Sequence, residues 1–139
     1  MDLKLELIVI PVSDVDRTKA FYERAGFNCD VDHRAGDAFR VVQFTPPGSA
    51  CSITFGVGIS EGTPGSVQGL HLVVDDIEAA RAALVGRGVD VSEPFHFGET
   101  GQVPGLHPNR ERYGTFATFA DPDGNGWLLQ EAPAPAPGG

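Results

Sequence analysis

The sequence predicts an α+β fold built from two βαβββ modules. The main observation is an internal repeat, in which residues 10–32 align without a gap with residues 72–94. Gly26, for example, falls on Gly88, 62 positions later. Two copies of this length indicate a duplicated module, because solenoids need three or more units of shorter period. Each copy has the same order of patterns: a strand-like apolar run, a helical segment and three further strand-like segments.

The first module is expected over about residues 5–58. Its apolar run at residues 5–12 predicts a strand. Ser13 or Asp14 can cap the helix of about ten residues that follows, since both side chains accept hydrogen bonds from free amide groups. Gly26 ends this helix as a residue that tolerates positive φ. Three strands follow, separated by Arg-Ala-Gly and Pro-Pro-Gly turns, over Phe27–Asp32, Ala38–Thr45 and Cys51–Val57.

The second module is expected over about residues 67–131. A strand at residues 67–74 leads into a helix that is capped by Asp76 and ends at Gly88. The Asp-Pro-Asp-Gly-Asn stretch at residues 121–125 predicts a tight turn, because Pro fixes φ and the Gly-Asn pair tolerates positive φ. The other strands of this module are expected over Val89–Phe95, Gly114–Ala120 and Gly126–Glu131.

One long segment distinguishes the second module from the first. Between Phe97 and Gly114 the chain is rich in Gly and Pro, which predicts a loop without regular structure. Such a loop is either a lid or binding loop, or a mobile insertion without a function. The last residues, 132–139, read APAPAPGG and are expected to be disordered because they have nothing to bury.

Composition narrows the classes of function. The 139 residues are 41% hydrophobic, which suits one globular domain over residues 1–131. A net charge of −9 argues against nucleic-acid partners, which need a basic surface. No apolar run is long enough for a membrane span and the start lacks the pattern of a signal peptide, so we expect a cytoplasmic protein.

Cys29 and Cys51 fall in expected strands without metal-binding spacing, which predicts reduced packing residues.

Three stretches together carry a resemblance to a known family. They are IPVSDVDRTKAFYERAGF in the first module, HLVVDDIEAARAALVGRGVDV in the second and FADPDGNGW near the end, so the resemblance covers about residues 5–131. The sequence resembles the vicinal oxygen chelate superfamily, which includes glyoxalase I, extradiol dioxygenases and bleomycin-resistance proteins. The resemblance implies paired βαβββ modules whose strands curl into a mixed sheet around a cavity, commonly completed in a homodimer.

The resemblance also places the family's metal ligands, which are mostly His, Glu or Gln, on the first and last strands of each module. The equivalent positions here carry Leu7, Gly69 next to Gln68, Leu128, and Ser52 or Thr54. Leu and Gly side chains supply no oxygen or nitrogen ligand, so no metal site and no cofactor are expected.

A divalent metal held by displaced ligands remains the alternative. A register slip of one residue would bring in Glu6 or Glu131, but neighbouring residues of a strand point to opposite faces. We therefore expect both carboxylates to be solvated strand ends.

Other side chains are candidates for contact with a small-molecule ligand. His71 shares a strand face with Gly69, and its imidazole is able to act as a general base or as a hydrogen-bond partner. A structural role is the alternative for His71. His107, Arg110 and Arg112 in the long segment form a cluster that either meets an anionic ligand or belongs to a solvated loop, and the solvated loop is the expectation. Aromatic residues of the strands can line an apolar pocket. The expected ligand-binding residues are His71, Gln130, Phe55, Phe97, Tyr113 and Arg112, with His71 as the one catalytic candidate.

The sequence leaves the choice between a binding protein and an enzyme open. The first hypothesis is a glyoxalase/bleomycin-resistance-like protein that binds a small organic molecule in its cavity without a metal. The second is a metal-dependent lyase, isomerase or dioxygenase with displaced ligands, or a metal-free enzyme that uses His71. A third is an accessory subunit with a vestigial cavity. No nucleophile motif such as GxSxG or a P-loop is present to decide among them.

Overall fold

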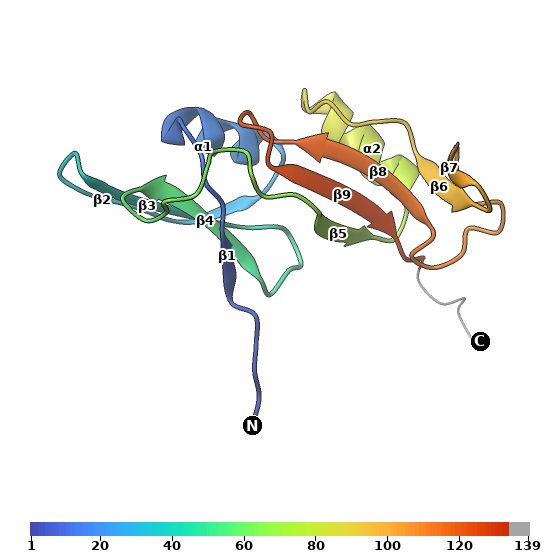
Figure 1. Cartoon of the computed structure of the whole chain (residues 1–139), viewed down its shortest axis with the longest axis horizontal. Coiled ribbons are helices and arrows are strands. Elements are labelled where there is room, and N and C mark those ends of the chain that lie inside the picture. The colour runs from blue at the N-terminus through green and yellow to red at the C-terminus, as the bar shows by residue number, and fades with distance from the viewer. Residues whose placement is uncertain (134–139) are drawn as a thin grey trace. The chain divides into compact units, whose positions relative to one another are not determined.

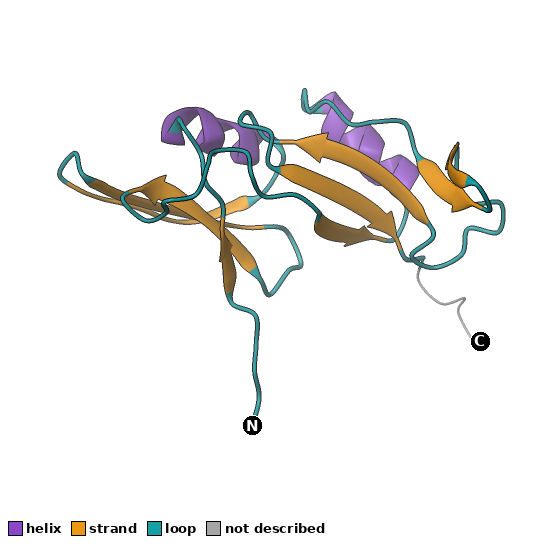
Figure 2. Cartoon of the chain, viewed as in Figure 1, coloured by secondary structure: helices purple, strands orange, loops and turns teal. Residues whose placement is uncertain are grey.

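The computed structural model describes residues 1–133, which contain two helices and nine strands (Figures 1 and 2). The chain divides into two compact units. The first comprises residues 1–68 together with Asp121–Asn125, and the second comprises residues 69–120 together with the segment that starts at Gly126. The α+β class expected from the sequence is confirmed, and each unit has its own sheet. The first unit has the expected βαβββ order, whereas the second has one additional strand and the order βαββββ.

The first unit holds a four-stranded mixed sheet with the strand order β1-β4-β3-β2. β1 pairs in parallel with β4, whereas the other two pairs are antiparallel. The elements of this unit are β1 (Leu7–Val9), α1 (Val15–Arg24), β2 (Asn28–Ala35), β3 (Phe39–Thr45) and β4 (Ser52–Val57).

Helix α1 covers one face of this sheet and packs on β3 and β4. Asp14 is its N-cap and accepts a hydrogen bond from the Arg17 amide, as expected for an Asp before an apolar helical pattern. Tyr22 is fully buried and its ring contacts those of Phe44 and Phe55, 6.1 and 5.9 Å away. These aromatic rings form the centre of the core of the first unit.

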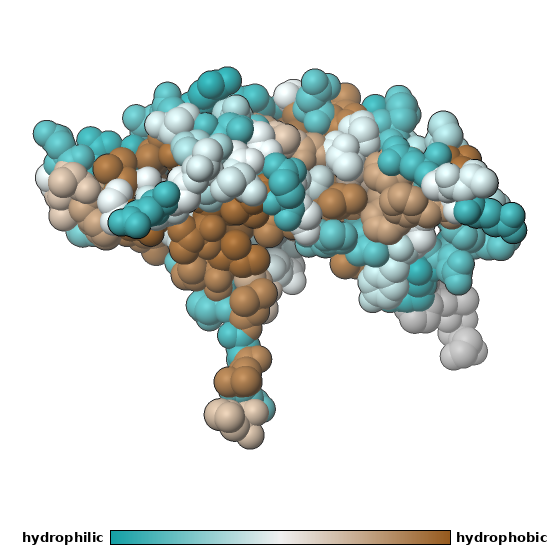
Figure 3. Space-filling model, viewed as in Figure 1, coloured by the Kyte–Doolittle hydropathy of each residue, from teal (hydrophilic) through white to brown (hydrophobic). Residues whose placement is uncertain are grey.

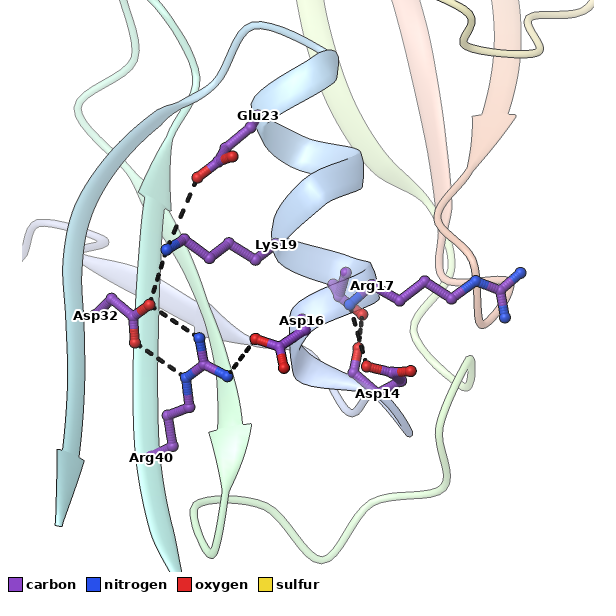
Figure 4. Close-up of polar contacts among 8 residues, drawn as sticks. Asp14, Asp16, Arg17, Lys19, Glu23, Asp32 and Arg40 are labelled. Carbon is purple, nitrogen blue, oxygen red and sulfur yellow. Dashed lines mark hydrogen bonds and ion pairs between the residues drawn. The ribbon is translucent and has the colours of Figure 1, made fainter. Parts of the chain in front are cut away.

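A charged network fastens α1 to the strands beside it (Figure 4). Arg40 on β3 is buried and donates two hydrogen bonds to Asp32 on β2, at 3.0 and 2.9 Å, and one to Asp16 on α1 at 2.7 Å. Lys19 on α1 donates to the same Asp32 carboxylate. The bonds from Arg40 and Lys19 hold the pKa of Asp32 well below its usual range. Burial of the guanidinium is tolerated because its charge is paired with two carboxylates.

The second unit holds a five-stranded sheet with the order β5-β9-β8-β6-β7. β5 pairs in parallel with β9, as β1 does with β4, and the remaining pairs are antiparallel. Helix α2 packs on β8 and β9, with Ile77 and Leu84 buried against them. The elements are β5 (Leu70–Val74), α2 (Ile77–Gly86), β6 (Phe95–Gly98), β7 (Gly101–Pro104), β8 (Thr115–Ala120) and β9 (Gly126–Glu131).

The turn at Asp121–Asn125 joins β8 to β9 but belongs to the first unit. Asn125 is fully buried, donates through Nδ2 to the Pro11 carbonyl and to Asp121, and accepts a hydrogen bond from the Val67 amide. Asp121 in turn accepts a hydrogen bond from the Tyr22 hydroxyl at 3.0 Å. The turn therefore satisfies buried polar groups that lie far from it in the sequence, in addition to reversing the chain.

Most of the expected elements are confirmed, and three expectations are wrong. Both helices start after the expected Asp caps. The strand expected at Val89–Phe95 begins only at Phe95. Before it, Ser92 makes isolated hydrogen bonds with Thr118 of β8, and Pro94 has no amide hydrogen to donate to a neighbouring strand. Part of the long loop forms β7, a hairpin with β6. Cys29 is exposed on β2, so it is not a packing residue.

The remaining expectations concern the tail and membrane insertion. Of the tail expected to be disordered, residues 134–139 lie outside the described residues. Neither of the two described helices has the length and apolar character that a membrane crossing requires.

We expect Asn125→Ala to lower the free energy of unfolding by about 2–4 kcal/mol, because it leaves the Val67 amide without its acceptor and removes the buried side-chain donor of the Pro11 carbonyl and of Asp121. Urea unfolding followed by circular dichroism measures the change. Asn28→Ala, at an exposed position of β2, is the matched control and should change the stability by less than about 0.5 kcal/mol. Equal effects of the two substitutions would contradict a structural role of the turn.

Candidate functional site

The second sheet has one face that α2 does not cover, and we call it the open face. Because strand residues alternate, Trp127 and Leu129 point to the helix, whereas Leu128 and Gln130 point away from it. The register then places two rows of side chains across the open face. One row is His71, Leu128 and Thr118, and the next is Val73, Gln130, Phe116 and Phe95.

His71 is exposed on this face and its orientation is fixed by its own strand. Its Nδ1 atom lies 2.6 Å from the carbonyl oxygen of Gly69. A carbonyl only accepts hydrogen bonds, so the neutral ring carries its proton on Nδ1 and presents Nε2 as an acceptor. His71 can therefore accept a hydrogen bond from a ligand, or take up a proton, beside Leu128.

Three phenylalanines form an aromatic group at the β6 side of the open face. The rings of Phe95 and Phe116 stack at 5.8 Å, and Phe97 meets both edge-on at 5.9 and 5.5 Å. Phe97 is 58% exposed, so much of its ring is accessible to a ligand. A cavity of about 370 Å³ lies next to this group and is lined by Ser92, Glu93, Pro94, Phe95, Gln102, Pro104 and Thr118. The volume suits a small organic molecule, and Phe95 contributes the one aromatic side chain among these lining residues.

The segment of residues 105–114 runs from β7 to β8, and side chains of β9 hold it. Gln130 donates through Nε2 to the Tyr113 carbonyl at 3.1 Å, and the Tyr113 amide donates to the Glu131 carbonyl at 2.6 Å. Arg112 lies with its guanidinium 5.5 Å from the centre of the Tyr113 ring, a cation–π contact. Gln130, Tyr113 and Arg112, expected from the sequence as ligand-binding residues, are thus neighbours in the second unit.

Glu131 is the residue for which the expectation from the sequence is wrong. It is 0% exposed rather than solvated, because it lies on the helix face of β9, opposite to Leu128. Its carboxylate accepts hydrogen bonds from Arg110 through both oxygens and from the Ile77 amide at 2.9 Å. The bond from Arg110 lowers the pKa of Glu131 below its ordinary value, although burial opposes this shift.

The first sheet also has a face away from its helix. Leu7 pairs with Ser52 and Val9 with Thr54, so these four side chains lie together on it. The two hydroxyl groups are already engaged. Ser52 shares a hydrogen bond with Thr45, and Thr54 donates to the Val42 carbonyl. This face of the first sheet is therefore mainly an apolar surface.

The residues at the family's metal positions do not fit a divalent ion. Leu7 lies opposite Ser52, and Leu128 lies opposite His71, so each pair offers at most one hydroxyl or one imidazole. Gln68 is used elsewhere, since its amide donates to the Gly65 and Gly124 carbonyls. Among residues 1–133 no group of three or more His, Cys, Asp or Glu side chains is placed to hold a metal ion. The donor chemistry of these positions therefore supplies too few ligands for a metal centre.

Phe55, an expected site residue, and His107 of the long segment lie apart from the open face. Phe55 is 0% exposed and packs with Tyr22 and Phe44 under α1, so we leave it out of the proposed site. His107 lies against His96 and near Glu111, within the segment of residues 105–114. Phe95 and Phe116 were among many strand aromatics in the sequence, and only the strand register shows that they share the open face with Phe97.

Comparisons with known proteins agree with this fold. A family model described as "Glyoxalase/Bleomycin resistance protein/Dioxygenase superfamily" matches residues 4–129. The solved structure of TnmS3, described as an antibiotic binding protein from Streptomyces sp. CB03234, is 33% identical and has a TM-score of 0.72, with 94% of this chain and 97% of that chain covered. A glyoxalase/bleomycin resistance protein from Streptomyces sp. CB03234 is 34% identical with a TM-score of 0.68, covering 91% of this chain and 99% of that one. The uncharacterized protein YetH of Bacillus subtilis (strain 168) is 26% identical over 127 residues, which are 89% of this chain and 94% of YetH.

We expect Glu131→Gln to lower the free energy of unfolding at pH 7 by about 1–3 kcal/mol. A neutral amide oxygen accepts a weaker hydrogen bond from the Arg110 guanidinium than the carboxylate does. Since the pKa of Glu131 is lowered in the folded state, its contribution is present above the ordinary Glu value of about 4.3. The contribution is lost as the pH falls through the lower folded-state value, so the two proteins should converge in acid.

Urea unfolding of wild type and variant between pH 7 and pH 3 measures this convergence. Glu61→Gln, at an exposed position, is the matched control and should follow wild type throughout. A difference between wild type and Glu131→Gln that stays constant over this pH range would contradict the assignment.

Proposed function

Because the chain belongs to the glyoxalase/bleomycin resistance protein/dioxygenase superfamily, we propose that it binds a small aromatic organic molecule on the open face of its second sheet, without a metal ion. The observation that carries this proposal is the set of side chains on the open face. Leu128 stands where the family's last-strand carboxylate is expected, and the aromatic group of Phe95, Phe97 and Phe116 lies beside it. Apolar walls with a few directed polar groups favour binding of an organic molecule.

The polar groups of this face suit recognition of such a ligand. On the open face, His71 offers the Nε2 acceptor and Thr118 offers a hydroxyl. In the segment that Gln130 holds, Arg112 carries a positive charge beside the Tyr113 ring and also donates to the Pro133 carbonyl. A ligand with an aromatic system and a hydroxyl or acidic group matches this set. The antibiotic-binding description of TnmS3 supports an antibiotic as the class of ligand, which the protein would sequester.

A metal-free enzyme is the second candidate function, and His71 favours it. The bond from Nδ1 to Gly69 leaves Nε2 free to accept a proton from a bound molecule. If His71→Ala abolishes conversion of a bound compound, followed by mass spectrometry, while its affinity survives, then the protein is an enzyme. Recovery of the unchanged compound from wild type would support binding alone.

Binding is tested with the aromatic anion 8-anilinonaphthalene-1-sulfonate (ANS) by isothermal titration calorimetry. We expect saturable binding to wild type that EDTA does not alter. Phe116→Ala should raise the Kd about tenfold, because the loss of one stacked ring costs roughly 1–2 kcal/mol. Val85→Ala removes an exposed apolar side chain from α2 and is the control, with an unchanged Kd. Loss of binding in EDTA would show that a metal is required and would overturn the proposal.

We also propose that the protein is a homodimer. β1 and β5 are edge strands of their sheets, and each leaves one row of backbone groups unpaired in its sheet. The segment before β1 alternates Met1, Leu3 and Leu5 with polar residues and continues the pattern of Leu7. Leu3 and Leu5 are 86% and 68% exposed, and apolar surface extends along this N-terminal segment in Figure 3. A second copy would cover these side chains.

Light scattering should give a mass of about twice the 14.7 kDa of the chain. The double substitution Leu3→Asp and Leu5→Asp should shift the protein to the monomer. Lys4→Asp changes a charge in the same segment without removing an apolar side chain and is the control. A wild-type protein that runs only as a 14.7 kDa species would refute the dimer. The cytoplasmic location stays a prediction from the sequence.

A further inference from the structure

The segment of residues 105–114 is held from both faces of β9. Gln130 and Glu131 are adjacent in the strand, so their side chains point to opposite faces. The Gln130 amide donates to the Tyr113 carbonyl on the open-face side, and the Glu131 carboxylate accepts from Arg110 on the helix side. The segment therefore wraps around the end of β9 and connects the buried helix side to the open face.

The ion pair of Arg110 with Glu131 on the helix side of β9 is supported by further contacts. Glu131 is completely buried, and its carboxylate also accepts a hydrogen bond from the Ile77 amide at the start of α2. Arg110 lies 3.8 Å from the Asp76 carboxylate and 3.6 Å from that of Glu78, in addition to its bond with Glu131. The guanidinium of Arg110 is thus surrounded by three carboxylates, and this arrangement raises its pKa.

The backbone of the segment is strained at two positions. Arg110 has φ +47° and Tyr113 has φ +67°, and within residues 1–133 no other residue besides glycine has a positive φ. Side chains other than glycine seldom adopt this conformation, and it persists only when the surrounding bonds enforce it. Here the enforcing bonds are those of Arg110 to Glu131 and of Tyr113 to the β9 backbone and Gln130.

We propose that Arg110 and Glu131 are positioning residues for the ligand-binding face. Their ion pair on the helix side holds the strained segment so that Tyr113 and Arg112 form one wall of the site beside Gln130. This inference rests on the proposed function, because it assigns a role in the binding of an aromatic ligand. Without the ion pair the backbone at Tyr113 relaxes, the wall is formed only part of the time, and the apparent Kd rises in proportion.

The test is a double-mutant cycle with Arg110→Ala and Tyr113→Ala, measured as the Kd for ANS by calorimetry. We expect Arg110→Ala to raise the Kd about tenfold, as for a wall formed roughly one tenth of the time. In the Tyr113→Ala background the same substitution should change the Kd less than about twofold, because the group that it positions is gone. Arg24→Ala, an exposed arginine of α1, is the control and should bind ANS as wild type does.

A second measurement follows the segment itself. Amide hydrogen exchange of peptides that cover residues 105–114 should accelerate in Arg110→Ala. It should accelerate to a smaller degree in Arg110→Lys, which keeps the charge but loses the bidentate hydrogen bonding to Glu131. Peptides from the first unit should exchange as in wild type. This comparison separates release of the segment from a general loss of stability.

The outcomes separate this inference from the proposed function. An equal change in Kd from Arg110→Ala in both backgrounds, or exchange that does not accelerate, would overturn the positioning role. A faster exchange with an unchanged Kd would overturn it as well. Failure of wild type to bind ANS would overturn the proposed function, while the exchange data would still show whether the ion pair holds the segment.

Discussion

The buried carboxylate of Glu131 is the constraint on which the second unit depends. A charged group with no exposure to water is stable only if other groups replace its hydration, and here the Arg110 guanidinium and the Ile77 amide do so. These partners lie in the segment before β8 and at the start of α2, so one side chain joins the last strand, the helix and the connecting segment. The strained backbone at Arg110 and Tyr113 is a consequence of these bonds.

Alternate residues of β9 belong to the core on one face and to the candidate site on the other. Trp127, Leu129 and Glu131 face the helix and build the core, whereas Leu128 and Gln130 face away and belong to the candidate site. The two faces stay connected through the segment of residues 105–114, which Glu131 holds on the helix side and Gln130 holds on the open-face side. The position that other members of the family use for a metal carboxylate has become apolar here, while a carboxylate three residues later serves the fold.

The two modules have different buried charged residues on the helix sides of their sheets. In the first, Arg40 is buried and joins α1 to β2 through Asp16 and Asp32. In the second, the buried charge is Glu131, and it joins α2 to the segment of residues 105–114. The two copies share a backbone pattern, but each satisfies its buried charge with different residues. Only the second copy acquired the aromatic group on its open face.

The sequence by itself determined the duplicated order of a strand, a helix and further strands, the Asp14 and Asp76 caps and the turn at Asp121–Asn125, because these depend on local periodicity and on the φ preferences of nearby residues. The family resemblance placed Leu7 and Leu128 at the metal positions, and strand periodicity placed His71 on the same strand face as Gly69. Only the tertiary structure decided that Glu131 is buried, that Phe55 belongs to the core and that residues 101–104 pair with β6. The partner of Glu131 is 21 residues earlier in the chain, and no local pattern encodes a contact that exists only once the strands have paired.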